Sequence, residues 1–243
     1  MKRWKNRKKP LSVRADMIEI GSAAWCRLIA EGAEVLLHAP VSSLQLEQFA
    51  IHIRELMLWN RKTNLTAITD PAEAAIKHVV DSLAPAGWIP PEATVLDVGS
   101  GGGFPGIPLK IVMPSLSVTL IDASRKKNSF QRHVIRALRL DGITALQERV
   151  EIFSAHPEQH RAFSVIICRA FTNLADFIET AAPLLKPNGV IIAMKGGISA
   201  DEQADADAAI TRLHQRGDAF QWRVVPYVLP FLNLERCLYI FTL

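Results

Sequence analysis

Residues 94–108 read T-V-L-D-V-G-S-G-G-G-F-P-G-I-P, and this stretch decides the fold class. Its apolar start predicts a short buried strand. The glycines that follow predict a tight turn whose backbone a ligand can approach, because glycine has no Cβ. The segment from Gly101 to Gly106 also fits the dinucleotide-binding pattern G-x-G-x-x-G. The stretch therefore predicts the first strand and the ligand loop of a nucleotide-binding α/β domain.

Two acidic residues narrow the kind of ligand. Asp97 lies inside the first strand, where a buried carboxylate is costly unless it binds polar groups of the loop or a cationic ligand. A second apolar strand is predicted over 118–121, and it ends in Asp122, about 20 residues beyond the glycine loop, where an acid binds ribose hydroxyls. The two acids favour an adenosine-containing ligand.

The rest of the chain after residue 93 alternates between strand and helix patterns, which predicts a mainly parallel sheet with helices on both faces. The last two predicted strands are separated by a short turn, which permits antiparallel pairing and excludes a helical crossover. The predicted strands cover 94–98, 118–121, 145–147, 163–167, 190–194, 222–228 and 237–242, and the predicted helices follow Gly106, Lys126, Asn173 and Asp201.

Residues 11–90 have helical periodicity and no convincing strand. We expect a basic tail and an uncertain helical segment over 1–40, a helical extension over 41–90 and the ligand-binding domain over 91–243. Asp70 is the expected N-cap of a helix that runs to about Ala84, with Pro71 at its first position and Glu73 folding back. One buried stripe is predicted from Leu44, Phe49, Ile53, Leu56 and Met57.

A polar turn is predicted over residues 59–66, W-N-R-K-T-N-L-T, between two helices. Its aromatic residue and two cations suit a surface that stacks on bases and contacts phosphates, and Asn60 and Lys62 are candidate RNA contacts. The alternative, which is commoner, is an ordinary capped loop with Trp59 packed in the core.

The net charge of +4 is a property of the first ten residues, because six of the 28 basic residues lie there and the remaining 22 face 24 acidic ones. This tail is either a solvated arm or a phosphate-binding one. The three separated cysteines argue against a disulfide framework and have no metal-ligand spacing. Without a signal peptide or an apolar run long enough for a membrane, we expect a cytoplasmic protein with no metal and no obligate protein partner.

The glycine loop, Asp97 and the closing antiparallel strand resemble the Rossmann-like class I S-adenosylmethionine-dependent methyltransferases, whose seven-stranded sheet is parallel except for its last strand. Closer still, the chain resembles the RsmG family, also called glucose-inhibited division protein B, over about residues 44–240. The motifs that carry this resemblance are W-N-R-K-T-N-L-T-A-I-T at 59–69, K-H-V-V-D-S-L at 77–83, L-D-V-G-S-G-G-G-F-P-G-I-P at 96–108, R-A-F at 169–171 and A-M-K-G at 193–196.

The chain departs from the family pattern in a few places. The family often has Arg at the position of Lys77, an acidic residue and glycine near Asn233 and Leu234, and His at the position of Cys237. The last strand and the loop before it are therefore the part to which the resemblance transfers least firmly.

The resemblance implies S-adenosyl-L-methionine as cofactor and 16S ribosomal RNA, in a small-subunit particle, as substrate. Gly99 and Phe104 are expected to flank the cofactor, and Gly101 and Gly103 to admit its methionine end. Asp122 is expected to bind the ribose. The implied adenine contacts are Val150 and Glu151, although from its residue type Glu151 is more often a solvent-facing acid.

The basic residues near the strand ends are candidate ligand contacts. Arg169 ends the fourth predicted strand and is expected to bind the cofactor carboxylate or an RNA phosphate, or else to form an ion pair with a neighbouring helix. Lys195 is a candidate phosphate contact at the end of the fifth strand. Further RNA candidates are Arg125 and Lys126, in a basic cluster after Asp122, and Arg236. We expect His78 and His133 to be structural.

The reaction implied by the family, methylation of guanine N7, needs no general base, because N7 carries a lone pair and no proton. No catalytic acid or base is therefore assigned. Methylation of an exocyclic amine is disfavoured because Cys168-Arg169-Ala170-Phe171 stands where an Asn- or Asp-Pro-Pro-aromatic loop is expected. Three other readings stay open: methylation of pyrimidine C5 through Cys168, a nicotinamide-dependent oxidoreductase, and an RNA-binding module without catalysis.

Overall fold

The computed structural model describes residues 18–169 and 173–243 of the chain. The basic tail, and Ala170 and Phe171 of the R-A-F motif, lie outside the described residues.

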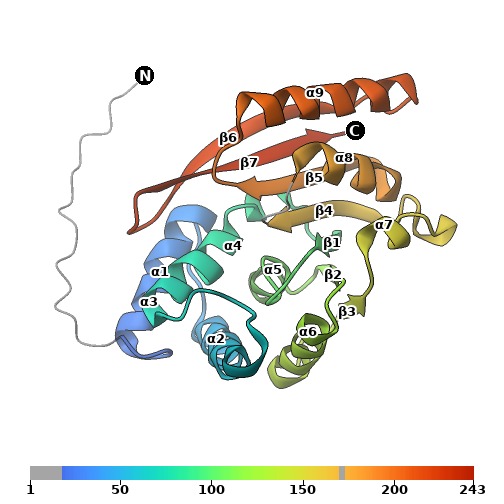
Figure 1. The fold of residues 1–243 in the computed structure, drawn as a ribbon. Coiled ribbons are helices and arrows are strands. Elements are labelled where there is room, and N and C mark those ends of the chain that lie inside the picture. The colour runs from blue at the N-terminus through green and yellow to red at the C-terminus, as the bar shows by residue number, and fades with distance from the viewer. Residues whose placement is uncertain (1–17, 170–172) are drawn as a thin grey trace, which may run out of the picture.

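The described residues form a seven-stranded sheet with the strand order β3-β2-β1-β4-β5-β7-β6. Neighbouring strands from β3 to β5 are parallel, whereas β7 is antiparallel to both β5 and β6. This confirms the predicted parallel sheet with an antiparallel closing strand (Figure 1). The strands are β1 (Thr94–Val98), β2 (Ser117–Asp122), β3 (Ile143–Gln147), β4 (Phe163–Arg169), β5 (Leu185–Lys195), β6 (Gln221–Leu229) and β7 (Leu234–Thr242).

Several strands begin earlier than the sequence pattern predicts, most of all β5. The segment from Leu185 to Gly189 contains proline, asparagine and glycine, which are typical of turns. The structure accommodates it with a register shift between Phe163 and Val165 of the neighbouring strand, and Asn188 has a positive φ of 60°. A β-bulge of this kind has no apolar alternation, so the pattern of residues does not reveal it.

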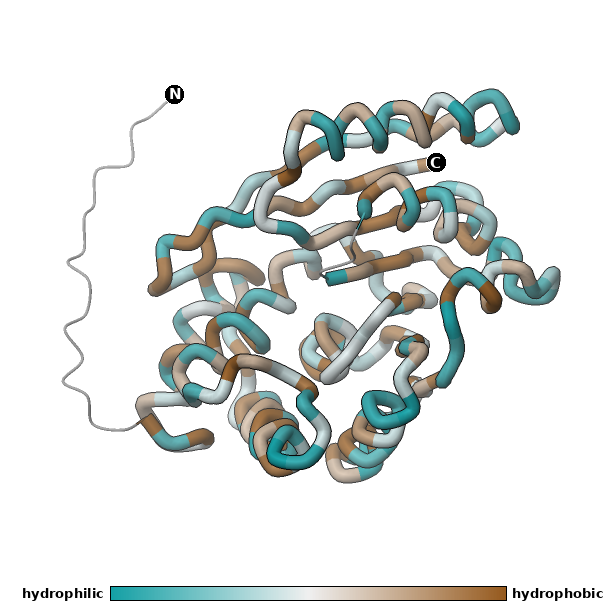
Figure 2. The backbone as a smooth tube through the Cα atoms, viewed as in Figure 1, coloured by the Kyte–Doolittle hydropathy of each residue, from teal (hydrophilic) through white to brown (hydrophobic). Residues whose placement is uncertain are grey.

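Helices cover both faces of the sheet, as predicted. One face carries α5, α6 and the N-terminal helices, and the other carries α7, α8 and α9, with a separate apolar cluster on each face (Figures 1 and 2). The helical elements are α1 (Ala23–Leu37), α2 (Ser43–Thr63), α3 (Pro71–Ala74), the π-helix η1 (Ala75–Val80), α4 (Asp81–Leu83), η2 (Ala86–Trp88), α5 (Gly106–Val112), α6 (Arg125–Leu138), α7 (Val150–Phe153), η3 (Pro157–Gln159), α8 (Leu174–Ala181), η4 (Ala182–Leu184) and α9 (Ala200–Gln215).

The N-terminal helices share one hydrophobic core with the sheet. Trp25 and Leu83 belong to the same buried cluster as Val95 and Leu109. The Trp25 indole also donates a hydrogen bond of 3.0 Å to the Pro71 carbonyl, which joins α1 to α3. Burial of each large apolar side chain stabilises the fold by roughly 2 kcal/mol. The predicted boundary near residue 90 therefore separates helices from sheet along the chain but not in the packing.

Two predictions for the helical extension are wrong. Helix α2 continues to Thr63, so Trp59 and Asn60 are helical instead of part of a turn, and the helix ends at Asn64, whose φ is 49°. An apolar neighbour on α6 stabilises this last part of the helix, since the Trp59 ring packs 5.7 Å from that of Phe130. Leu44 is 65% exposed and lies outside the buried stripe, in the first turn of α2.

The helix start at Asp70 is confirmed in part. The Asp70 carboxylate accepts the Glu73 N–H at 2.8 Å, and Pro71 occupies the first helical position. Glu73 does not fold back to the N-cap. Its carboxylate instead forms an ion pair of 3.0 Å with Lys77, one helical turn further on.

Candidate active site

The glycine loop leaves the sheet at the carboxyl end of β1. Asp97 is fully buried in this strand, and its Oδ2 accepts the Gly106 N–H at 2.7 Å, so a polar group of the loop binds the carboxylate as expected. Burial raises the pKa of Asp97 to about 7, against the opposing effects of the Gly106 hydrogen bond and the Arg169 charge. Among the described residues, Asp97 Oδ1 has no hydrogen-bond partner. Strand β1 therefore holds a buried acid beside the loop, with one oxygen left for a donor.

Gly99 presents bare backbone to open space. Its φ is +68°, and a Cβ at this position would meet no atom within 4 Å. The next glycine of the loop, Gly101, donates its N–H to Asp122 Oδ2 at 3.1 Å, so the acid that ends β2 binds the loop that follows β1. At Gly103 a Cβ would lie 2.3 Å from Ile107 Cδ1, so this position has no room for a side chain. A ligand can approach the loop at Gly99.

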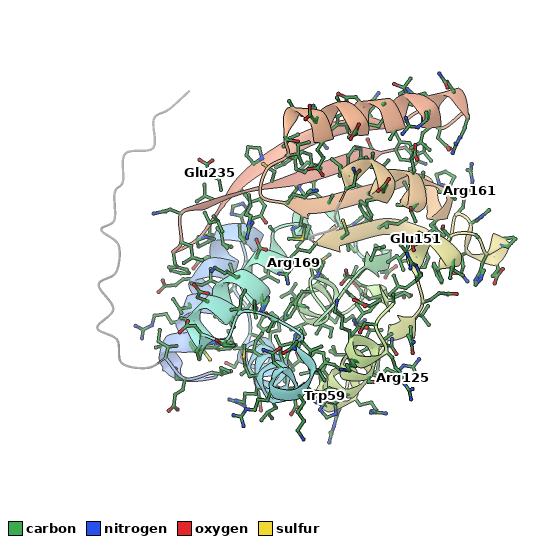
Figure 3. The ribbon with its side chains drawn as sticks, in the orientation of Figure 1. Trp59, Arg125, Glu151, Arg161, Arg169 and Glu235 are labelled. Atoms are coloured by element: carbon green, nitrogen blue, oxygen red, sulfur yellow. The ribbon has the colours of Figure 1, made fainter. Side chains whose placement is uncertain are left out.

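A cavity of about 430 Å³ opens beside Gly99, and we call it the cofactor cavity. It brings together the predicted residues Gly99, Asp122, Val150 and Glu151. Asp122 is buried and also accepts the Ser124 N–H at 2.9 Å. Glu151, labelled in Figure 3, is exposed, and its carboxylate lies 3.4 Å from the Arg149 Nε. The cavity is lined by Val98, Gly99, Ile121, Asp122, Ala123, Lys127, Glu148, Arg149, Val150 and Glu151.

Phe104 does not line this cavity. Its ring is only 4% exposed and stacks on His52 and on His78, each with ring centroids 4.6 Å apart. The Arg169 guanidinium carbon lies 5.0 Å from the centroid of the same ring. Phe104 therefore joins the glycine loop to the N-terminal helices, an arrangement that the motif alone does not indicate.

A second cavity, of about 310 Å³, lies at the same edge of the sheet, and we call it the cationic cavity. Val98 pairs with Cys168 in the parallel β1 and β4, so Gly99 and Arg169 emerge side by side from neighbouring strands. Arg169 stands in this cavity, not in the cofactor cavity. The cationic cavity is lined by Ile68, Lys77, His78, Asp81, Arg169, Met194, Lys195, Gly196, Tyr227 and Arg236.

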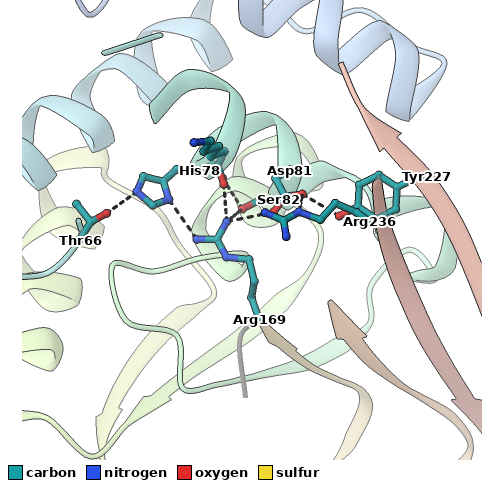
Figure 4. Close-up of polar contacts among 8 residues, drawn as sticks. Thr66, His78, Asp81, Ser82, Arg169, Tyr227 and Arg236 are labelled. Atoms are coloured by element: carbon teal, nitrogen blue, oxygen red, sulfur yellow. Dashed lines mark hydrogen bonds and ion pairs between the residues drawn. The ribbon is translucent and has the colours of Figure 1, made fainter. Parts of the chain in front are cut away.

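Arg169 is held by the N-terminal helices (Figure 4). Its guanidinium donates to the Lys77 carbonyl at 3.0 Å and to the His78 Nδ1 at 3.3 Å. It also lies 3.7 Å from the Asp81 carboxylate. The expected alternative, an ion pair with a neighbouring helix, is thereby confirmed, and the same side chain still faces the cavity.

The histidines near the site have hydrogen-bond partners within the protein. Burial, with help from the Arg169 charge, lowers the pKa of His78 to about 3, so the ring is neutral and donates its Nε2–H to Thr66 Oγ1 at 2.9 Å. Burial likewise lowers the pKa of His52 to about 4, and its Nε2 donates to the Gly102 carbonyl at 2.8 Å. His133 binds Glu55 at 2.6 Å. These hydrogen bonds agree with the structural roles predicted for His78 and His133.

The candidate RNA contacts fall into three groups. Arg125 and Lys126 are exposed at the start of α6, and Lys62 is exposed near the end of α2 (Figure 3 labels Arg125). The Asn60 amide, in contrast, exchanges two hydrogen bonds of 2.9 Å with the Thr66 backbone and shapes the end of α2. Lys195 and Arg236 line the cationic cavity, where Lys195 forms an ion pair with Glu202.

Among the residues that line the cationic cavity, three with charged or hydroxyl side chains were not predicted as site residues, namely Lys77, Asp81 and Tyr227. Lys77 and Asp81 lie in the K-H-V-V-D-S-L motif at 77–83, and their place in a family motif could have marked them as site residues. Tyr227 lies in β6, outside the quoted motifs, so nothing in the sequence marked it. In the part of the chain that the structure describes, no group of three potential metal ligands was found, and no helix is long and apolar enough to cross a membrane.

The strand order, the glycine loop after β1 and the acid at the end of β2 define the chain as a Rossmann-like S-adenosylmethionine-dependent methyltransferase. Solved structures share this fold. An O-methyltransferase from Bacillus cereus in complex with SAH superposes with a TM-score of 0.56 at 18% identity, over 88% of this chain and 97% of that one. A SAM-dependent methyltransferase from Aquifex aeolicus gives a TM-score of 0.51 at 18% identity, over 74% of this chain and 96% of that one.

The family follows from sequence similarity. The model of the GidB family, rRNA small subunit methyltransferase G, matches residues 45–221. Ribosomal RNA small subunit methyltransferase G of Geobacter sulfurreducens is 43% identical over 213 residues, which cover 88% of this chain and 95% of that protein. Its counterpart from Geobacter sp. (strain M21) is 45% identical over 175 residues, or 72% of this chain and 79% of that protein. The chain belongs to the rRNA small subunit methyltransferase G family.

The residues present fit S-adenosylmethionine, the cofactor of this class. The cofactor cavity offers open backbone at Gly99, a carboxylate at Asp122 and the apolar Val150. The unpaired Asp97 oxygen is a further acceptor beside the loop, suited to the positive charge that this cofactor carries. The open backbone, an acceptor for hydroxyls and an apolar wall match the parts of an adenosine group.

Proposed function

We propose that this methyltransferase modifies N7 of one guanine in 16S ribosomal RNA, within a small-subunit particle in the cytoplasm. The observation that carries the proposal is the cationic cavity. Its cations Lys77, Arg169, Lys195 and Arg236 stand beside the strand end that presents Gly99. A polyanionic substrate placed there lies next to the cofactor, and lysine and arginine are the side chains that bind phosphates.

The reaction depends on the placement of guanine N7 relative to the methyl group more than on proton transfer. When bound, S-adenosylmethionine supplies an electrophilic methyl group. The N7 lone pair forms the new carbon–nitrogen bond, the sulfur–carbon bond breaks, and the positive charge passes to the base, so no proton has to leave. An in-line approach at roughly 3 Å with water excluded is then the main requirement.

The titratable groups of the cationic cavity agree with this assignment. His78 has both ring nitrogens engaged, by Arg169 and Thr66. Asp81 accepts the Tyr227 hydroxyl at 2.8 Å. These groups hold one another in place, and we assign none of them as an acid or a base.

For the cofactor we propose contacts from the loop residues Gly99, Gly101 and Gly103, with Phe104 supporting the loop from behind. Asp122 binds the ribose. The adenine lies against Val150 and Glu151, and Arg169 faces the boundary between cofactor and RNA. On the RNA side, Arg125, Lys126 and Lys62 contact phosphates outside the cavity, whereas Lys195 and Arg236 act inside it. Asn60 acts by shaping the end of α2.

Methylation of pyrimidine C5 is the second methyl-transfer reaction to consider. It requires a cysteine nucleophile that reaches the substrate. Cys168 is buried in β4, with 1% of its surface exposed, and it points into the apolar cluster beneath α8 and α9. This burial favours N7 over C5.

The test is methyl transfer from labelled S-adenosylmethionine to undermethylated small subunits and, separately, to naked 16S RNA, with the product mapped by N7-specific strand scission. We expect scission at one guanine, with the particle as the better substrate. Label without scission overturns the N7 assignment, and equal turnover on naked RNA overturns the preference for the particle. The Gly99→Ala variant, argued below to lose the cofactor, is the matched control for background label.

A further inference from the structure

One buried carboxylate joins four distant parts of the chain. Asp81 begins α4 and is 4% exposed. Its Oδ1 accepts the Tyr227 hydroxyl of β6 at 2.8 Å and lies 4.0 Å from the Arg236 Nε of β7. Its Oδ2 lies 3.7 Å from the Arg169 guanidinium of β4. Figure 4 shows Arg169 and Arg236 reaching Asp81 from different strands.

The charges around Asp81 do not balance. Lys77 is paired with Glu73 at 3.0 Å, and Lys195 is paired with Glu202. Arg169 and Arg236 have Asp81 as their only ion-pair partner among the described residues. Two guanidinium groups therefore share one carboxylate, which leaves one positive charge facing the cavity.

One of the two guanidinium groups beside Asp81 also has a nitrogen without a hydrogen bond to any described residue. The Arg236 Nε is buried and has no hydrogen-bond partner among the described residues. Its separation of 4.0 Å from Asp81 is too long for a hydrogen bond. A buried donor without an acceptor is costly, and an anion in the cavity relieves that cost. The unbalanced charge and the unpaired donor both indicate an anionic ligand between Arg169 and Arg236.

We propose that Asp81 is a positioning residue for the RNA strand, which holds Arg169 and Arg236 at the spacing that receives one backbone phosphate. This rests on the proposed function and names the residue that prepares the site. Without the carboxylate the two guanidinium groups repel each other, and the pair separates. The N-terminal helices thus take part in substrate binding through Asp81.

The direction in which RNA affinity changes distinguishes a positioning role of Asp81 from a simple charge effect. Removing any negative charge from a protein that binds a polyanion strengthens binding by long-range electrostatics. Removing a positioning carboxylate weakens binding, because the two guanidinium groups that bind the phosphate separate. Asp81→Asn keeps the size of the side chain and separates the two effects. Glu92→Gln is the matched control, since Glu92 is an exposed acid just before β1, at the opposite edge of the sheet.

The experiment measures KM for undermethylated small subunits, the dissociation constant for 16S RNA without cofactor, and cofactor affinity. For Asp81→Asn we expect both RNA constants to rise about tenfold, as for loss of one charge-assisted contact. Cofactor affinity stays within about twofold, and the slope of log affinity against log salt falls by about one. For Glu92→Gln we expect RNA constants that are unchanged or lower.

RNA binding at least as tight in Asp81→Asn as in the wild type overturns the proposal. If Asp81→Asn does not fold, Tyr227→Phe replaces it, because this change frees the carboxylate and keeps its charge; unchanged RNA binding in that variant also overturns the role. Turnover by the wild type tests the proposed function separately. The binding constants are measured without cofactor, so they test Asp81 even where the methylated position proves different.

Discussion

Asp97 Oδ2 and the Gly106 backbone are in contact at 2.7 Å, and the same oxygen lies 2.7 Å from the point that a Cβ on residue 106 would occupy. The hydrogen bond fixes the carboxylate of β1 against the first residue of α5. It is possible only because residue 106 has no side chain. The glycine loop is thus anchored at its C-terminal end, where Gly106 binds the carboxylate of a strand residue, Asp97.

Gly106→Ala is expected to destabilise the protein and weaken cofactor binding. The added methyl group would stand 2.4 Å from Leu120 Cδ2 as well as against Asp97, so the loop must move. Overpacking of this kind costs about 1–3 kcal/mol. Urea unfolding and calorimetric titration with cofactor measure the two effects. Gly87→Ala is the control, because a Cβ there meets nothing within 4 Å; equal stability of the two variants would contradict the prediction.

Gly99→Ala is expected to abolish most cofactor binding at little cost in stability. Its Cβ would enter the cofactor cavity, where no protein atom lies within 4 Å. The positive φ alone costs roughly 1 kcal/mol. Gly217→Ala is a matched control, since Gly217 also has a positive φ, of +99°, and open space around it, but lies after α9. Titration should show loss of cofactor affinity in Gly99→Ala only, and a similar affinity in both variants would argue against this site.

Asp97→Asn is expected to change how stability depends on pH. Burial raises the pKa of Asp97 from 3.8 to about 7, so between these values the folded protein holds a proton that the unfolded chain has lost. The unfolding free energy contributed by Asp97 therefore falls as pH rises through this window. The wild-type value minus the variant value should fall by on the order of 4 kcal/mol from pH 4 to pH 7.

Urea unfolding at intervals of pH measures this difference. His52 and His78 titrate at about 4 and about 3 in the folded protein, and they are present in both proteins, so their effects cancel. A difference that does not vary with pH would show that the pKa of Asp97 is the same in the folded and the unfolded protein.

The double variant Arg125→Gln, Lys126→Gln is expected to weaken RNA binding and to lower the salt slope by up to about two, one for each lost phosphate contact. Both side chains are exposed at the start of α6, beside the carboxyl edge of the sheet. Arg161→Gln with Arg216→Gln removes the same charge from exposed positions before β4 and after α9, at the opposite edge. Filter binding over a range of salt compares the two. Equal salt slopes for the two double variants would show that Arg125 and Lys126 do not contact RNA phosphates.

The sequence predicted what depends on neighbours along the chain. The residue pattern predicted the first strand, the glycine turn and the acids Asp97 and Asp122. These groups lie close together because parallel strands all end at the same edge of the sheet. Val150 and Glu151, which the family resemblance implies, also line the cofactor cavity with Gly99. The main architecture follows from the same alternation of strands and helices.

What the sequence did not predict depends on contacts between distant segments. Tyr227 and Asp81 are 146 residues apart, and nothing in either segment indicates the other. The end of α2 was missed for a related reason. Trp59 is held in the helix by packing against Phe130 of α6, whereas the polar residues after it are typical of a turn. The prediction of Asn60 as an RNA contact rests on the polar and aromatic residues around it, and its hydrogen bonds to Thr66 cannot be inferred from residue type.

The position of β7 beside β5 has a consequence for how the enzyme is made. The loop, the acid and the wall of the cofactor cavity all precede residue 152, whereas the cationic cavity requires Tyr227 and Arg236. Chains are synthesised from the N-terminus, so a growing chain can complete the first cavity well before the second. A nascent copy, still attached to a ribosome, therefore lacks the phosphate site that we propose between Arg169 and Arg236, and it acquires this site only after β7 has been translated and paired.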